Sequence, residues 1–298
     1  MTTMPPLTAM PTFTFAALPR AARSAFQWRL LLLWVALMLI PTAILGYTVW
    51  SMLSANLDYS VRAAELAHQI DLTVFADLMA AHGKSSAAFN NAGVLALIAT
   101  LLVSPLFSGM AATAARADGT PGFRELVAGG IREYPRMLRM LVWSVVPLGI
   151  ALALGGAAMD AAAEHGRTVI VEADADLAQW GALAVMLLLF ALAHATLDAG
   201  RAALAIERRR TSAVKAWWSG CKMLLKRPLA TLGVYLAISA LGLAIAAALV
   251  VGRINVSGAS IGGFIGALLL VQLTVAVIGW MRSARLFAMV ELARSVRT

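Results

Sequence analysis

Residues 30–50 read LLLLWVALMLIPTAILGYTVW, a run of 21 residues without a charged side chain. The hydrocarbon core of a bilayer is about 30 Å thick, and a helix of roughly 20 apolar residues crosses it. The run is also longer than the apolar part of a cleaved signal sequence, which has about 7–15 residues. We therefore predict that this segment is an uncleaved membrane-spanning helix.

Five more segments share this length and apolar character. They are Ala92–Met110, Met137–Met159, Trp180–Ala199, Leu229–Val251 and Ile261–Met281. Pro41, Pro105 and Pro147 interrupt three of the six segments, and we expect a kink at each because proline leaves one helical carbonyl without its partner. The sequence thus predicts an all-α polytopic transmembrane helical bundle of six spans, forming a single integral membrane domain over residues 1–298.

The composition of the whole chain excludes several other classes of protein. Of the 298 residues, 61% are hydrophobic and 13% are charged. A soluble domain has about 45–50% apolar and about 25% charged residues, so a soluble globule and a disordered chain are both excluded. Cys221 is the single cysteine, which excludes an intramolecular disulfide and a metal site built from several cysteines.

The net charge of +9 is sorted between the two sides of the predicted bundle. The connections on one side, with both termini, hold 20 of the Lys and Arg residues, and those on the other side hold four. Cytoplasmic connections of membrane proteins carry this excess. We therefore predict cytoplasmic N- and C-termini with three hairpins reaching outward. Because topology accounts for the charge, we expect no nucleic-acid partner.

Two predicted cytoplasmic segments resemble each other. Residues 123–139 read FRELVAGGIREYPRMLR and residues 213–229 read AVKAWWSGCKMLLKRPL. Each has apolar residues at helical spacing, a central glycine (Gly130 or Gly220) and a proline near its end. We predict three repeats of amphipathic helix, span, outer loop and span, with the first amphipathic helix at 13–27. Along the chain these form a cytoplasmic segment (1–29), a first hairpin (30–110), a second repeat (111–199) and a third (200–298).

The polar faces of these segments carry the candidate docking residues. Tryptophan beside lysine is typical of a headgroup interface, where anionic lipid attracts each cation by about 1 kcal/mol. The candidates are Arg132, Arg136, Lys215, Trp217, Trp218, Lys222 and Lys226. Two interpretations stay open. The helices are connectors held by anionic headgroups at the cytoplasmic face, or they are a docking face for a cytoplasmic or membrane protein partner.

His194 and Asp198 form a candidate intramembrane polar pair. They are four residues apart near the cytoplasmic end of the fourth span, so they share one face of that helix. Ionisable groups inside a span point to a functional site, such as a proton relay or an ion site. The alternative is a structural pair that involves Arg201.

Gly258, Gly262 and Gly266 are spaced four residues apart and predict a helix-packing surface, because small residues let a second helix approach closely. The outer segment 58–81 is predicted to be helical, and His68, Asp71, Asp77 and His82 lie in or just after it without a recognised metal-ligand spacing. The sequence contains no P-loop, zinc-protease, nucleophile-elbow or dinucleotide-binding motif. We expect no metal, no cofactor and no catalytic residue, and hence no enzyme.

The basic, aromatic helix with its central glycine, flanked by paired spans, resembles a family of six-span bacterial inner-membrane proteins. That family includes the membrane domain fused to some glycerophosphodiester phosphodiesterases. The chain lacks the phosphodiesterase domain, so the resemblance does not imply that activity. The excess of arginine (20) over lysine (4) is typical of a GC-rich bacterial genome and indicates the same inner (plasma) membrane.

We predict a multi-pass inner-membrane protein that acts as a non-enzymatic scaffold or accessory subunit. The alternative is a transporter or permease subunit, which the three prolines inside spans and the polar pair favour.

Overall fold

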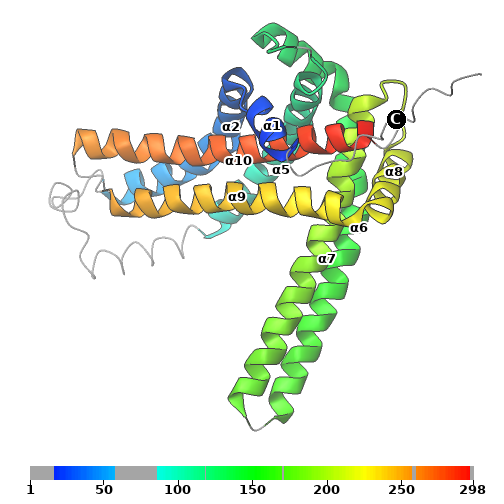
Figure 1. Cartoon of the computed structure of the whole chain (residues 1–298). Coiled ribbons are helices and arrows are strands. Elements are labelled where there is room, and N and C mark those ends of the chain that lie inside the picture. The colour runs from blue at the N-terminus through cyan, green and yellow to red at the C-terminus, as the bar shows by residue number, and fades with distance from the viewer. Residues whose placement is uncertain (1–16, 58–85, 118, 170, 257–259, 296–298) are drawn as a thin grey trace, which may run out of the picture. The chain divides into compact units, whose positions relative to one another are not determined.

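The computed structural model describes residues 17–57, 86–117, 119–169, 171–256 and 260–295 of the chain (Figure 1). Within these ranges all regular structure is helical, in eight helices and no strand. They are α1 (Ala17–Ser24), α2 (Trp28–Leu57), α5 (Ser86–Ala114), α6 (Phe123–Thr168), α7 (Glu172–Ile206), α8 (Ala213–Lys226), α9 (Pro228–Asn255) and α10 (Ile261–Ser295). The predicted all-α fold class is confirmed.

Six of these helices are long and apolar enough to cross a membrane, and each contains one of the six predicted segments. They are α2, α5, α6, α7, α9 and α10. The structure therefore supports a membrane protein. The first predicted amphipathic helix, 13–27, is described only from residue 17 on, as α1, and the predicted outer helix at 58–81 lies outside the described residues.

Helix α6 runs further than the sequence predicts. It joins the predicted amphipathic segment and the predicted span into one helix of 46 residues, with Pro135 and Pro147 inside it. In the corresponding place of the predicted third repeat the helix is interrupted, since α8 ends at Lys226 and α9 begins at Pro228. Proline fits the first helical position because its missing N–H has no helical acceptor there.

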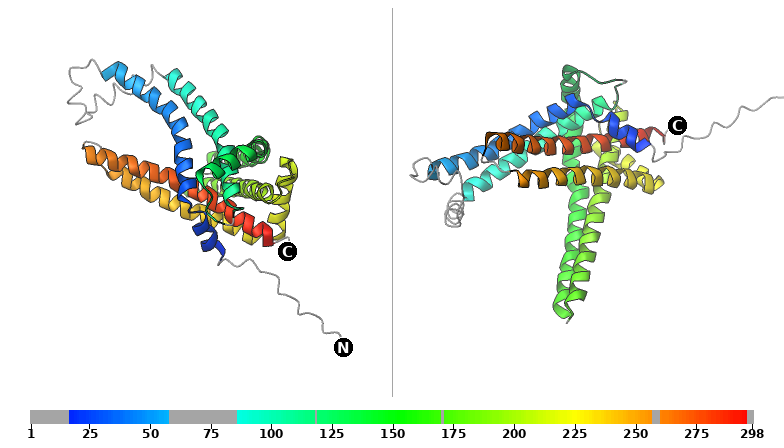
Figure 2. Two further views of the ribbon diagram at one scale, coloured as in Figure 1. Left: turned by 90° about the horizontal axis from the view of Figure 1, so that it is seen from above. Right: turned by 60° about the vertical axis from the view of Figure 1, so that its left-hand side comes forward.

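The chain divides into two compact units. In described residues, unit 1 comprises 17–27, 108–241 and 281–295, and unit 2 comprises 28–57, 86–107 and 242–280. Both units combine segments far apart in the sequence, whereas the predicted divisions follow the hairpins along the chain. In unit 1, α6 and α7 lie side by side along their lengths (Figures 1 and 2), and α8 packs on α7.

Small residues form the closest helix contacts in unit 1. A Cβ on Gly220 of α8 would collide with the Thr196 carbonyl oxygen and lie 2.8 Å from the amide nitrogen of Gly200 on α7. A Cβ on Gly109 of α5 would lie 2.9 Å from the carbonyl oxygen of Gly130 on α6. Backbones approach this closely in membrane helices only where side chains are minimal.

The predicted glycine ladder has a different environment. Gly258 lies outside the described residues. A Cβ on Gly262 would have nothing within 4 Å, and one on Gly266 would make an ordinary contact with Val256 at 3.9 Å. Among the described glycines, the tight approaches are therefore elsewhere, at positions such as Gly220, where a second backbone crosses.

Candidate functional site

The predicted polar pair is part of a larger buried cluster in unit 1. His194 Nδ1 lies 3.6 Å from Asp198 Oδ2 on α7. The same carboxylate faces two guanidinium groups, with Arg201 Nη1 2.5 Å from Oδ1 and Arg285 Nε 3.3 Å from Oδ2. The side chains of Asp198 and Arg285 are each 9% exposed. Both carboxylate oxygens therefore already have cationic neighbours.

Arg285 lies on α10 and connects Asp198 of α7 to two residues of α9. Its Nη1 donates to Ser239 Oγ at 3.0 Å, and its guanidinium carbon lies 5.0 Å from the centre of the Tyr235 ring. The His194 ring packs near the same tyrosine, with ring centres 5.6 Å apart. We name His194, Asp198, Arg201, Tyr235, Ser239 and Arg285 the Asp198 cluster. Its contacts connect three helices, which fits the structural alternative that includes Arg201.

Arg136, predicted on an exposed polar face, is instead buried at the C-terminal end of α7. Its Nη2 donates to the carbonyl oxygens of Leu204 and Glu207 at 2.8 and 2.6 Å, and its Nε donates to that of Arg210 at 3.0 Å. Nη1 pairs with Glu133. The last carbonyls of a helix lack helical donors and carry partial negative charge, so a cation stabilises this end.

Arg116 joins Glu133 and Arg136 in a second group of buried charges. Its Nη2 lies 2.9 Å from Glu133 Oε1, and its Nη1 donates to the Ala205 carbonyl oxygen at 3.0 Å. Burial lowers the pKa of Arg116 from its ordinary value, and Glu133 opposes that shift. Because an arginine pKa starts above 12, the guanidinium stays charged at neutral pH. The set Arg116, Glu133 and Arg136 joins the ends of α5 and α7 to α6.

The two predicted tryptophans of α8 have different environments. Trp217 is half-buried, donates from Nε1 to Thr196 Oγ1 at 3.1 Å and packs edge-on against Trp143 at 5.7 Å between ring centres. Trp218 is 54% exposed. Trp217 therefore holds α8 to its neighbours, and Trp218 faces outward. Cys221, on the same helix, has a thiol whose pKa is raised by burial.

The remaining docking candidates are exposed and lie beside exposed apolar side chains. The exposed cations are Arg132, Lys215, Lys222 and Lys226. The exposed apolar side chains in the first turns of α6 and on α8 are Phe123, Val127, Ile131, Val214, Trp218 and Leu225. We name these ten residues the interfacial face. The predicted apolar stripes thus point outward in part, while the inward face combines alanine, glycine and paired charges with a few large apolar side chains such as Leu126 and Met223. Lipid accepts apolar side chains without cost, so the pattern does not mark the core.

Lys222 and Lys226 also line a small pocket of about 130 Å³ in unit 1. Ser219 and Met223 of α8 complete that side of the pocket, and alanines of α7 and α10 close it.

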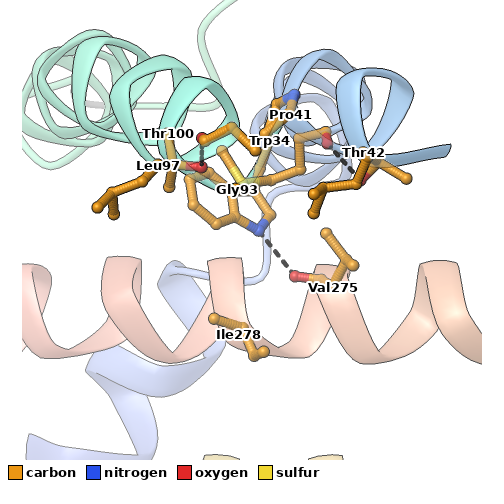
Figure 3. Close-up of a pocket in the computed structure, with 11 residues that line it drawn as sticks. Trp34, Pro41, Thr42, Gly93, Leu97, Thr100, Val275 and Ile278 are labelled. Carbon is orange, nitrogen blue, oxygen red and sulfur yellow. Dashed lines mark hydrogen bonds between the residues drawn. The ribbon is translucent and has the colours of Figure 1, made fainter. Parts of the chain in front are cut away.

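Unit 2 contains an apolar pocket of about 430 Å³ between α2, α5 and α10 (Figure 3). Its polar atoms are already occupied: Trp34 Nε1 donates to the Val275 carbonyl at 2.7 Å, and Thr42 and Thr100 donate to carbonyls of their own helices. A Cβ on Gly279 would collide with the Trp34 ring, so this glycine lets the indole lie against α10. The lining includes no charged group, so the pocket suits an apolar chain. Of the residues that line this pocket, only Pro41 is singled out by the sequence.

No group of three or more His, Cys, Asp or Glu residues that could hold a metal ion occurs in the described part of the chain. No family model, no curated protein and no solved structure matches the chain.

Proposed function

We propose that this chain is a non-enzymatic, multi-pass membrane protein that serves as a scaffold or accessory subunit, held to anionic lipid by α8 and the first turns of α6. The interfacial face carries this proposal. It exposes Phe123, Val127, Trp218 and Leu225 together with lysine and arginine. A helix with this composition lies in the headgroup region, with its apolar side chains in the acyl boundary and its cations near phosphates.

The sorting of charge in the sequence supports a location in the bacterial inner membrane with both termini cytoplasmic. The glycine contacts support the internal repeat. In each case a glycine near the end of one span, Gly109 or Gly200, meets the central glycine of the next amphipathic segment, Gly130 or Gly220. The resemblance to the six-span inner-membrane family belongs to the same proposal.

A non-enzymatic role is supported by the buried ionisable groups. Asp198 faces two arginines and a histidine, and Glu133 faces two arginines. Groups paired in this way connect helices, and neither carboxylate has an oxygen without a cation beside it. Both sets of buried charges therefore favour a structural role over a catalytic one.

Spin labels test the position of α8 directly, because Cys221 is the single cysteine and is replaced first. The variant C221S/L225C places the label on the interfacial face, where Leu225 is 78% exposed. In vesicles of anionic phosphatidylglycerol we expect the label to collide more with oxygen, which concentrates in lipid, than with a water-soluble nickel complex. C221S/R209C is the control, and its label should report water. A water-exposed label at position 225 contradicts the proposal.

The scaffold role is tested by cross-linking in native membranes. We expect the variant K215E/K222E to lose protein neighbours that wild-type protein retains, while the protein stays in the membrane at normal abundance. An unchanged set of neighbours argues against docking through α8.

A transporter or permease subunit is the second candidate, and the apolar pocket beside Pro41 favours it. Gly93 lines this pocket, and a Cβ there would meet nothing within 4 Å, so Gly93→Leu fills the space without a clash at the Cβ. If the pocket carries cargo, proteoliposomes should move an apolar fluorescent probe, and this variant should slow that movement. Equal rates in wild type, variant and empty vesicles remove the pocket from consideration.

A further inference from the structure

A pocket of about 380 Å³ lies in unit 1 where α5 ends and α6 begins, and it is not part of the interfacial face apart from Arg132. Arg208, from the connection between α7 and α8, closes it. Its charged lining consists of Arg116, Glu125, Arg132, Glu133 and Arg208. The volume is within the range of about 300–1,000 Å³ that small-molecule sites occupy.

The two carboxylates of this pocket are already committed. Glu133 pairs with Arg116 and with Arg136 behind it. Glu125 accepts a hydrogen bond from the Gly122 amide at 2.8 Å, at the start of α6. Neither carboxylate forms an ion pair with Arg132 or Arg208, so the cations that face the pocket are not matched by its own acids.

Several hydrogen-bond donors of the pocket, in contrast, have no acceptor among the described residues. Among the described residues, Arg132 and Arg208 form neither a hydrogen bond nor an ion pair, and the buried Nε of Arg116 has no hydrogen-bond partner. Arg208 also acts electrostatically on Arg116 and contributes to its lowered pKa. Like charges held together around a cavity are stabilised by an anion placed between them.

We propose that this pocket binds a phosphate group, carried by an anionic phospholipid or by a small phosphate ester. Arg132 and Arg208 bind the phosphate oxygens, because the planar guanidinium donates two parallel hydrogen bonds to such a group. Arg116 keeps its Nη atoms on Glu133 and Ala205, and its positive charge adds to the attraction for the anion. The site does not depend on the scaffold role, since it is a discrete pocket that shares only Arg132 with the interfacial face.

The test compares two double variants with the same loss of charge. R132Q/R208Q removes the open donors of the pocket. R124Q/R209Q is the control, because Arg124 and Arg209 are exposed arginines of the same two segments that do not line the pocket. Each protein, purified in detergent, is titrated with inorganic phosphate in a calorimeter. It is also placed in vesicles of phosphatidylglycerol or phosphatidylcholine, extracted, and analysed for retained lipid by native mass spectrometry.

We expect wild-type protein and R124Q/R209Q to bind alike, and R132Q/R208Q to bind at least about tenfold more weakly, as the loss of charge-assisted hydrogen bonds predicts. Saturable binding of inorganic phosphate identifies a soluble phosphate ester as the class. Retention of phosphatidylglycerol that phosphate does not displace identifies the lipid. Both results support the site.

Equal weakening in the two double variants overturns the proposal, because it shows only diffuse attraction between charges. Absence of binding to the wild-type protein also overturns it. Asp118 lies two positions after Arg116 in the sequence and outside the described residues. If D118N alone acquires binding, a carboxylate of the chain occupies the pocket in the natural protein and the proposal fails.

Discussion

Replacing Arg136 with methionine removes a buried cation and keeps much of the side-chain volume. The Arg136 side chain is 10% exposed, pairs with Glu133, and donates to two carbonyls at the end of α7 and to one in the connection that follows. Loss of one member of a buried ion pair costs about 3–5 kcal/mol. Because Glu133 keeps Arg116 as a partner, the lower end applies. We expect the free energy of unfolding to fall by about 3 kcal/mol, with part of the loss due to the uncapped helix end.

The assay is reversible unfolding in mixed micelles by titration with sodium dodecyl sulfate, followed by tryptophan fluorescence. The matched control is Arg132→Met, one turn earlier on α6, where the side chain is exposed and should change stability by less than about 0.5 kcal/mol. Arg136→Lys should lie between the two, because an ammonium cannot reproduce the forked contacts. A loss below about 1 kcal/mol for Arg136→Met, or equal losses in both methionine variants, would refute the reasoning.

Three further predictions use the same purified protein. Gly220→Leu should prevent native packing of α8, seen as loss of a monodisperse peak on size exclusion. Gly262→Ala should keep that peak and raise the free energy of unfolding by up to about 1 kcal/mol, because alanine is the better helix former. Equal behaviour of the two variants would contradict the close crossing of α8 and α7 at Gly220. Asp198→Asn leaves two arginines without their counter-charge and should lower the free energy of unfolding by about 3 kcal/mol in the same titration, and a neutral result would show that the Asp198 cluster is dispensable for folding. Burial raises the pKa of Cys221, so its thiolate forms only at higher pH. The rate of alkylation by iodoacetamide should therefore rise with a midpoint above the ordinary thiol pKa of about 8.5. The contribution of the neutral thiol to the free energy of unfolding should be lost as the pH rises through the pKa of the folded protein. A midpoint at or below that of the unfolded protein would contradict the burial of Cys221.

The six long helices could be predicted because their length and apolar content are properties of contiguous sequence. The partners of the charged residues could not, since Arg285 is 87 positions from Asp198 and no local pattern joins them. The proximity of His194 and Asp198 could be predicted, because residues four apart lie about one helical turn from each other.

The orientation of the amphipathic segments shows a second limit. In a soluble protein the apolar stripe marks the core, and that rule would place Ile131 inside and Arg136 outside. Here Ile131 is 63% exposed and Arg136 is buried, because carbonyls at the end of α7 bind the arginine. Pro135 lies inside α6 rather than between two helices, because a proline inside a helix removes one hydrogen bond and need not end the helix.

Helix α6 has a mechanical consequence that follows from its length alone. A helix of 46 residues is about 69 Å long, roughly twice the thickness of a bilayer's hydrocarbon core. A partner that binds its first turns therefore contacts the same continuous helix that is long enough to cross the bilayer. Between α8 and α9, by contrast, the helix is interrupted at Arg227. We therefore expect a displacement of the first turns of α6 to reach its span along one helix, and a displacement of α8 to reach α9 only across the interruption at Arg227.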